Sequence, residues 1–237
     1  MNARTRAFRD DYARTITPRG YRGLRHALLV ALAGGAMLAF AISPLRAADV
    51  ARLWWLIPAT FVLANLVEYF VHRHLMHRDT RLLHAMYVRH TLRHHRYFTH
   101  DDVELTGTHD LHAVLFPPVL LFFFSAVALG AAAAVALLLG RAAGLMFFAL
   151  ALAYYLAYEV LHLLAHWPRR EDTSRSSWLR RLLVHHRLHH APEVMARGNF
   201  NIVFPLGDRL FGTLRRECRD AAATQSTGEA LGSGKGS

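Results

Sequence analysis

The sequence predicts an all-α integral membrane protein with about four transmembrane helices, capped on one side by a helical, histidine-rich domain. Three observations support this prediction. Of the 237 residues, 53% are hydrophobic, and they form runs close to the roughly 20 residues that cross a bilayer. The 28 Lys and Arg residues lie outside these runs. Most of the 17 histidines cluster at the ends of the runs and in the polar segments beside them.

The formal net charge of +11 is shared with many nucleic-acid-binding proteins. Here 27 of the 28 basic residues are arginines that flank apolar runs, which is typical of membrane orientation signals, so we expect no nucleic-acid partner. The single cysteine, Cys218, excludes a scaffold held together by intrachain disulfides.

The N-terminal quarter is expected to hold a leader and the first span. Residues 1–25 carry seven arginines and form a basic leader that we place in the cytosol. Residues 26–44 are apolar and long enough to cross a bilayer. No small-x-small cleavage site follows, so we interpret this run as a retained span rather than a signal peptide. The second span covers 53–71 and begins with two interfacial tryptophans, so residues 26–61 hold the first span and the start of the second.

A polar segment, residues 72–112, then interrupts the apolar pattern with ten histidines, six arginines and five acids. The apolar stretch after it is too long for a single span. Gly140-Arg141 divides it into a hairpin of two spans, 119–139 and 142–161, and Pro117-Pro118 marks the start of the first.

The distribution of basic residues predicts the orientation. The leader, the 72–112 segment and the chain from residue 162 onward hold 25 of the 28, and with four spans they share one side, which the positive-inside rule makes cytoplasmic. We therefore expect both termini and the histidine segments at the cytoplasmic face of a bacterial inner membrane. Residues 214–237 are mostly small or polar and rich in Gly and Ser, so we expect them to be disordered.

Several histidines recur with helical spacing, and residues three or four apart on a helix share a face. These sets are His90/His94, His162/His166 and His186/His189/His190. Neutral imidazole is the commonest metal ligand in proteins, so we expect each set to direct its imidazoles to one place. The adjacent pairs His94-His95 and His189-His190 diverge by about 100° on a helix. That divergence favours ligands for two metal ions.

Two other roles would explain histidine-rich segments. A loose tract binds metal without catalysis, but it has no reason to recur with helical spacing on one side of several spans. A transporter needs ionisable residues deep in its spans, whereas the nearest here are Glu68 and Glu159 at span ends. A metal-binding or metal-transporting membrane protein is the alternative to an enzyme. For the isolated His26, His109 and His112 we expect hydrogen-bonding or interfacial roles.

The metal site is expected to contain imidazole rather than many carboxylates. The His-Glu-x-x-His motif of zinc peptidases is absent. Only Glu159-Val-Leu-His162 fits the Glu-x-x-His motif of soluble di-iron bundles. Glu68 and Glu159 precede motif histidines by four and three residues. Either they accept a hydrogen bond from a ligand imidazole, or they are solvated at the interface.

Four motifs resemble those of the fatty acid hydroxylase/sterol desaturase superfamily: EYFVHRHLMH at 68–77, HTLRHH at 90–95, HLLAH at 162–166 and HRLHH at 186–190. The run NFNIVFPLGDRLFGT at 199–213 is similar to that family's usual ending. The resemblance covers residues 62–213 and implies a four-helix membrane domain with a cytosolic dimetal site. The ligands it implies are His72, His77, His90, His94, His95, His162, His166, His186, His189 and His190.

The resemblance also implies two iron ions, with zinc able to accept the same ligands, and dioxygen as co-substrate. The reaction is hydroxylation or desaturation of a membrane lipid, with acyl, sterol and isoprenoid chains all open. The sequence shows no haem-attachment, four-cysteine or Gly-x-Gly-x-x-Gly motif. We therefore expect a separate electron donor: a reductase, a ferredoxin or a haem protein.

The sequence departs from the family's pattern at several positions. Three residues instead of two separate His90 from His94, and Gly207 replaces a common tryptophan, so a packing contact is lost or replaced. His72 and His77 lie about 140° apart on a regular helix; helical spacing favours His74 as the partner of His77, whereas the resemblance favours His72. The residues expected to support the ligands are Glu68, Glu159, His74, His84, Asn199 and Asp208.

Overall fold

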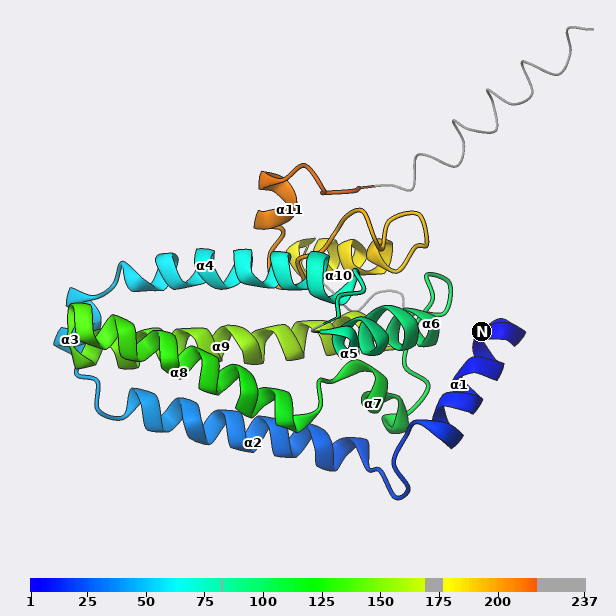
Figure 1. The fold of residues 1–237 in the computed structure, drawn as a ribbon, viewed down its shortest axis with the longest axis horizontal. Coiled ribbons are helices and arrows are strands. Elements are labelled where there is room, and N and C mark those ends of the chain that lie inside the picture. Colours follow the sequence, from blue (N-terminus) through cyan, green and yellow to red (C-terminus); the bar gives the residue numbers. More distant parts are fainter. Residues whose placement is uncertain (82, 169–176, 217–237) are drawn as a thin grey trace, which may run out of the picture.

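The computed structural model describes residues 1–81, 83–168 and 177–216, and these contain helices and no strand (Figure 1). The long helices are α1 (Ala3–Thr15), α2 (Gly23–Ile42), α4 (Leu56–Val71), α8 (Pro118–Leu139), α9 (Arg141–His166) and α10 (Ser177–His189). The short ones are α3 (Ala47–Arg52), α5 (His84–Tyr87), α6 (His95–Tyr97), α7 (Leu111–Val114), α11 (Leu206–Leu210), the 3-10 turn η3 (Thr108–Asp110) and two π-helices, η1 (His72–Met76) and η2 (Val88–His94).

Four helices, α2, α4, α8 and α9, run side by side along the long axis of the molecule (Figure 1). Helix α9 packs against the other three. Val30 of α2, Leu121 of α8 and Leu152 of α9 form one buried apolar cluster between them. These helices are apolar over most of their surface, which is expected of helices that face lipid as well as one another.

The hairpin predicted at Gly140-Arg141 is confirmed, because α8 ends and α9 begins there. Gly140 has a φ of 92°, a left-handed conformation that glycine adopts without strain. Four residues later, a Cβ on Gly144 would lie 2.6 Å from the carbonyl oxygen of Ala132. The hairpin therefore needs glycine at its turn and at its closest helix–helix contact.

Within the described ranges, three helical stretches are long and apolar enough to cross a membrane: Gly23–Ile42, Thr108–Leu139 and Arg141–His166. This is consistent with a multi-pass membrane protein. Helix α4, expected as a further span, has 16 residues and is shorter than the roughly 20 that a bilayer requires. The count of four spans therefore stays a prediction. Helix α9 extends five residues beyond the predicted end at 161 and so carries His162 and His166 on one continuous helix.

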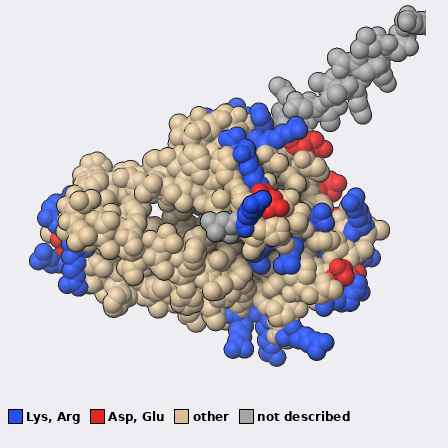
Figure 2. Space-filling view, viewed as in Figure 1, with Lys and Arg blue, Asp and Glu red and all other residues tan. Residues whose placement is uncertain are grey.

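The distribution of charged and apolar residues on the surface of the bundle is consistent with helices that cross a membrane. In Figure 2, Lys and Arg gather at the two ends of the molecule, and the zone between them shows almost only other residues. Large apolar side chains are exposed on that zone, among them Leu32 (69%), Phe122 (54%) and Leu137 (88%). A contiguous apolar surface of this kind is unfavourable in water and fits a lipid environment.

The N-terminal leader folds onto the end of the bundle that carries the histidines. Arg9 of α1 is buried, and its guanidinium donates to the backbone oxygens of Tyr97, Asp102 and Glu104 at 2.6–3.2 Å. The leader therefore contributes a structural contact besides its positive charge. Of the tail expected to be disordered, residues 217–237 lie outside the described part of the chain.

Candidate metal centre

The ten histidines predicted as ligands meet at one end of the bundle. They come from η1 and the residue after it, from η2 and α6, from the end of α9, and from α10 and the residue after it, and each is at most 8% exposed. Two groups form within the described residues. The first histidine group is His72, His77, His90, His95 and His189; the second is His94, His166, His186 and His190. Within each group the potential ligand atoms lie within 4.8 Å of one another. We add His162 to the second group because its Nε2 lies 3.3 Å from Nε2 of His94.

In the first group the Nε2 atoms face one another. His90 Nε2 lies 2.8 Å from His72 Nε2 and 3.1 Å from His95 Nε2. His77 Nε2 lies 3.0 Å from His189 Nε2. The second group has the same form, with His186 Nε2 at 3.1 Å from both His166 Nε2 and His190 Nε2.

The π-helices explain which histidines pair in the first group. A π-turn joins residues five apart, and the N–H of His77 donates to His72 O at 3.2 Å. The N–H of His95 likewise donates to His90 O. His72 therefore pairs with His77, and His90 pairs with His95. The α-helical pairing of His90 with His94 is wrong, because the π-turn moves His94 towards the second group.

On α9 and α10 the ordinary helical spacing applies. His162 and His166 both join the second group, as do His186 and His190, each pair being four residues apart. His189 turns to the first group, so the prediction that it shares one place with His186 and His190 is wrong: residues three apart on this helix diverge enough to face different groups. The prediction that adjacent histidines diverge is confirmed by the geometry, because His94-His95 and His189-His190 each divide between the two groups.

Backbone carbonyls fix the tautomers of five imidazoles, since an Nδ1 that faces a carbonyl must carry the hydrogen. The Nδ1 of His72 donates to Phe200 O. The other four donate over 2.5–2.9 Å: His94 to Ala113 O, His166 to Val103 O, His189 to Gly198 O and His190 to Phe98 O. In each neutral ring Nε2 therefore bears the lone pair.

This tautomer pattern tests whether the site fits metal. His186 Nε2 faces the lone pairs of His166 and His190 and carries at most one hydrogen, so at least one of these contacts has no hydrogen between its two nitrogens, which then repel each other. A cation between the nitrogens removes that repulsion. Two nitrogens bound to one ion at about 2.1 Å lie roughly 3 Å apart, which matches the observed spacings. The donor set fits a pair of imidazole-ligated metal ions.

Burial favours the neutral rings that bind metal. Removal from water lowers the pKa of His94 to about 3 and that of His189 to about 4, and hydrogen bonds to backbone carbonyls only partly offset this. Burial also lowers the pKa of His90 and His186, and neighbouring imidazoles lower it further. Neutral imidazoles need not release a proton to bind a cation.

The carbonyls that serve the first group lie in the loop between α10 and α11, and Asp208 shapes that loop. Its carboxylate accepts the N–H of Phe200 at 2.9 Å, the N–H of Asn201 at 2.8 Å and the hydroxyl of Thr213 at 2.7 Å. Burial opposes the charge, but these donors and nearby His185 hold the pKa of Asp208 at about 2. Asp208 therefore supports His72 through Phe200.

Asn199 stabilises the same loop. It adopts a φ of 58°, which Asn tolerates better than most residues. Its side-chain amide donates to His185 O and Arg215 O at 3.1 Å, and its Oδ1 accepts the N–H of Arg215 at 2.7 Å. These bonds hold the chain beside Gly198, whose carbonyl accepts from His189.

At Gly207 the packing contact expected of a tryptophan is replaced. A Cβ there would lie 2.6 Å from Cγ of Tyr69 and 2.8 Å from Oδ1 of Asn201. The ring of Tyr69 stacks on Phe211 at 4.9 Å. Tyr69 and Phe211 fill this region, so position 207 admits no side chain.

The two buried glutamates play a different part from either expectation. Glu68 accepts from the hydroxyl of Tyr154 and from the N–H groups of Ile202 and Val203. Glu159 accepts from the N–H of Phe116 at 3.3 Å and from a neighbouring tyrosine. Within the described part of the chain, the hydrogen bonds of both carboxylates go to backbone and tyrosine donors rather than to a ligand imidazole, and both are at most 9% exposed, so the predictions of direct support and of interfacial solvation are wrong. The two carboxylates instead accept hydrogen bonds from backbone N–H groups of loop residues that pack against the apolar bundle.

His74 and His84 do not support the ligands. The π-turn pairs His72 with His77 and leaves His74 stacked on Phe70, with ring centroids 6.0 Å apart. His84 lies 2.6 Å from the carboxylate of Asp79, and both side chains are more than half exposed. The expectation for these two residues is wrong because it depended on α-helical spacing and on chain proximity.

The isolated histidines form hydrogen bonds, as expected. His26 pairs with the hydroxyl of Tyr21 at 2.8 Å, and His112 pairs with that of Tyr12 at 2.9 Å. His109 lies 2.9 Å from a carboxylate oxygen of Asp110.

Some residues that shape the site were not among the predicted ones. Asn65 is fully buried in α4 and donates to Phe204 O at 2.7 Å and to the hydroxyl of Tyr154 at 2.9 Å. The sequence did contain a signal for Asn65. It is a single amide within an apolar run, and such a group needs a hydrogen-bond partner in lipid. Arg9 had no such signal, since it is one of seven arginines in the leader.

An apolar cavity of about 290 Å³ lies between α4, α8 and α9 and reaches the metal centre at His72 and Met76. Most of its wall is apolar, and its polar groups belong to Thr60, Glu68 and three tyrosines of α9. A second cavity of about 30 Å³ is bounded by His90, His94 and His162, and so touches both histidine groups. Met76 and Phe116 line both cavities.

Together these features define a helical protein with membrane-length apolar helices and a buried histidine centre that could hold metal ions. A family model described as fatty acid hydroxylase matches residues 57–213, about two thirds of the chain. The chain belongs to this family, within the fatty acid hydroxylase/sterol desaturase superfamily. Searches of curated proteins and of solved structures gave no match.

Proposed function

We propose that the protein is an oxygen-dependent lipid hydroxylase or desaturase that uses two histidine-ligated iron ions. The observation that carries this proposal is the apolar cavity between α4, α8 and α9, which ends at His72 of the first histidine group. Its shape and lining suit one hydrocarbon chain entering from the bilayer. The substrate class is an acyl, sterol or isoprenoid chain, and family membership supports this class.

The residues of the chain position the substrate and exclude water. The wall of the cavity offers aliphatic and aromatic side chains, so it binds a chain through burial of apolar surface. The small cavity has room for a molecule the size of dioxygen beside His90, His94 and His162. Because Met76 and Phe116 line both spaces, they set where the carbon chain and the oxidant meet.

Two iron ions bound by the histidine groups would supply the redox chemistry that allows dioxygen to oxidise an unactivated C–H bond. The buried imidazoles hold them in a region closed to bulk water, and the backbone carbonyls at Nδ1 fix each ring's orientation.

The reaction also needs electrons from a separate donor, and we propose that an acidic carrier docks at the histidine end. Lys and Arg are prominent there in Figure 2, and opposite charge on a carrier speeds association. A reductase, a ferredoxin and a haem protein all satisfy this requirement.

The test compares one ligand from each group with a histidine outside both. His189→Ala, His94→Ala and the control His84→Ala are produced in a host that lacks the gene. Iron per protein is measured after purification, and host lipids are profiled under air and under nitrogen. The wild type and His84→Ala should give a new hydroxylated or desaturated lipid under air only, and the two ligand variants should give none.

Two outcomes would contradict the proposal. One is wild-type production of the oxidised lipid by His189→Ala or His94→Ala. The other is an unchanged lipid profile with the wild type under air, with an acidic electron carrier supplied and iron bound. Metal uptake by those cells would then favour the transport alternative.

A further inference from the structure

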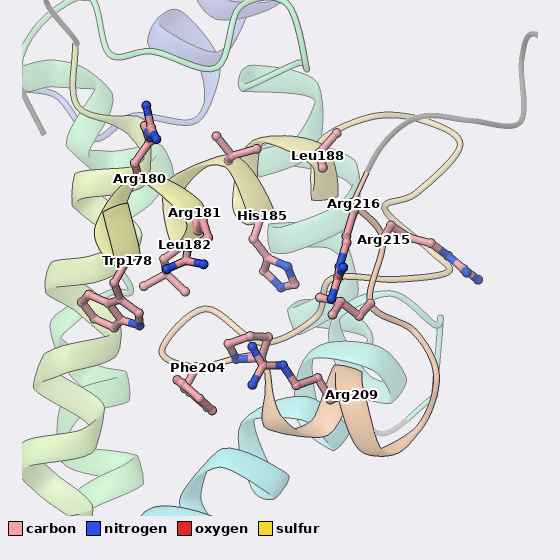
Figure 3. A pocket seen from close by; sticks show the side chains of 13 residues that line it. Trp178, Arg180, Arg181, Leu182, His185, Leu188, Phe204, Arg209, Arg215 and Arg216 are labelled. Carbon is pink, nitrogen blue, oxygen red and sulfur yellow. The ribbon is translucent and has the colours of Figure 1, made fainter. Parts of the chain in front are cut away.

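A second large pocket lies outside the histidine centre, between α10 and the segment that contains α11 and the residues after it (Figure 3). Its volume is about 580 Å³, within the range of small-molecule sites. Trp178, Leu182 and Phe204 give it an apolar wall. None of the residues that line it belongs to the apolar substrate cavity.

The pocket is strongly basic. Among the residues that the structure describes, five arginines and no acidic residue line it. In Figure 3 the side chains of Arg181, Arg209 and Arg216 extend towards its interior, whereas that of Arg180 points away. Asp208, which lies behind the pocket, is fully buried and already accepts three hydrogen bonds. Arg209 and Arg216 can therefore offer guanidinium donors to an anionic group, and arginine suits phosphate in particular.

The surroundings place this pocket at the edge of the apolar zone. Leu210 and Phe211, at the end of α11, are 62% and 46% exposed. The ring of Phe211 lies 5.3 Å from that of Phe70 on α4, which is also exposed. Trp178, on the opposite wall, is 48% exposed. Exposed apolar side chains beside arginines, with a tryptophan at the boundary, are typical of a membrane–water interface.

We propose that this pocket binds the phosphate headgroup of an anionic membrane phospholipid. Arg209 and Arg216 pair with the phosphate, while Trp178 and Phe204 contact the first part of the acyl chains. A concave pocket with an apolar wall suits a lipid better than the flat, acidic surface of a redox protein. The site is separate from the substrate cavity, because the seam of α4 and α9, closed by Asn65, Glu68 and Tyr154, lies between them.

The test uses the purified full-length protein in detergent and needs no activity. Binding of dioctanoyl phosphatidylglycerol is titrated by native mass spectrometry for the wild type, for Arg209→Gln/Arg216→Gln and for the matched control Arg180→Gln. The double variant should bind at least about tenfold more weakly, because charge-assisted hydrogen bonds to phosphate are lost. Arg180→Gln should stay within about twofold of the wild type.

Further ligands separate the possible sources of the anion. Dioctanoylglycerol, which has the chains without the phosphate, should bind the wild type no better than the phospholipid binds the double variant. Inorganic phosphate should compete only weakly. Metal content and melting temperature of every variant are compared with the wild type, and Arg209→Gln alone provides a milder change if the double variant is unstable.

Three results would overturn the proposal: equal phospholipid binding by the wild type and the double variant, equal binding of dioctanoylglycerol and phospholipid, or inorganic phosphate binding as tightly as the lipid. Loss of ferredoxin binding by a double variant that keeps its phospholipid would assign the pocket to an electron carrier instead.

Discussion

The two histidine groups contain five imidazoles each but are held by different parts of the fold. The first depends on two π-turns and on the loop after α10, where Gly198 and Phe200 offer their carbonyls and Asp208 fixes the backbone. The second depends on α-helical spacing and on the segment between α6 and α8, which contains Phe98, Val103 and Ala113. The two ion sites should therefore be separable by mutation, even though their imidazoles touch.

Hydrogen bonds from α1, which is distant in the sequence, stabilise the segment behind the second histidine group. Arg9 of α1 bonds three of its backbone carbonyls, and the carboxylate of Asp110 accepts from Thr106 N at 2.6 Å, from Gly107 N at 3.3 Å and from the hydroxyl of Tyr97. Arg9 and Asp110 lie 3.9 Å apart, and both are buried. The N-terminal helix therefore supports one histidine group, and the C-terminal loop supports the other.

The largest effect is expected from Arg9→Ala. This change removes the cation beside the buried Asp110 carboxylate and leaves three backbone carbonyls without their donor, which we expect to cost about 3–5 kcal/mol of folding stability. In protein that stays folded, the second group should lose metal before the first. Thermal unfolding and metal analysis in detergent measure both effects. The exposed Arg6, on the same helix, provides the control Arg6→Ala, and equal stability of the two variants would remove Arg9 from this role.

Asp208→Asn is the reciprocal change. It replaces an acceptor oxygen with a donor that faces the N–H groups of Phe200 and Asn201, so the loop behind His72 loosens. We expect the first group's metal affinity to fall about 10–100-fold with the second retained. Metal content after dialysis against a graded chelator should fall from two ions towards one. Simultaneous loss of both ions would show that the groups are not independent.

A smaller effect is expected from a change that alters substrate binding alone. Ala128 lines the apolar cavity, and Ala128→Leu should narrow it and lower lipid oxidation about tenfold with both metals retained, since overpacking costs about 1–3 kcal/mol. Ala126→Leu, on the exposed face of the same helix, is the control. Product yield and metal content are measured together. Unchanged yield with Ala128→Leu would mean that the lipid enters elsewhere.

The smallest effects belong to the histidines outside both groups. His74→Ala and His84→Ala remove side chains that touch no ligand, so stability should change by less than about 0.5 kcal/mol and metal content should stay at the wild-type level. Denaturation and metal analysis test this. Loss of an ion in either variant would show that the histidine concerned contributes to metal binding.

Much of the helical bundle can be predicted from the sequence, because the position of a membrane helix and the faces of its residues depend on residues that are close together in the chain. Apolar run length located the three helices that are long enough to cross a membrane, and Gly140-Arg141 located the hairpin. Spacing along α9 and α10 gave the pairs His162/His166 and His186/His190. Neighbouring residues on a helix point in different directions, which predicted that His94 and His95, and likewise His189 and His190, belong to different groups. These predictions needed only the geometry of one helix.

Residue spacing and the family resemblance together predict which histidines gather at one end of the bundle and how neighbouring imidazoles divide. The resemblance also favours His72 beside His77, but the π-turns that pair His72 with His77 and His90 with His95 have no reliable local signature and appear only in the folded chain. Asp208 is among the residues expected to support the ligands, whereas the backbone carbonyls that hold them, and the different roles of Glu68 and Glu159, follow from the tertiary structure. The physical reason is that buried donors find acceptors across long chain separations, which residue spacing cannot record.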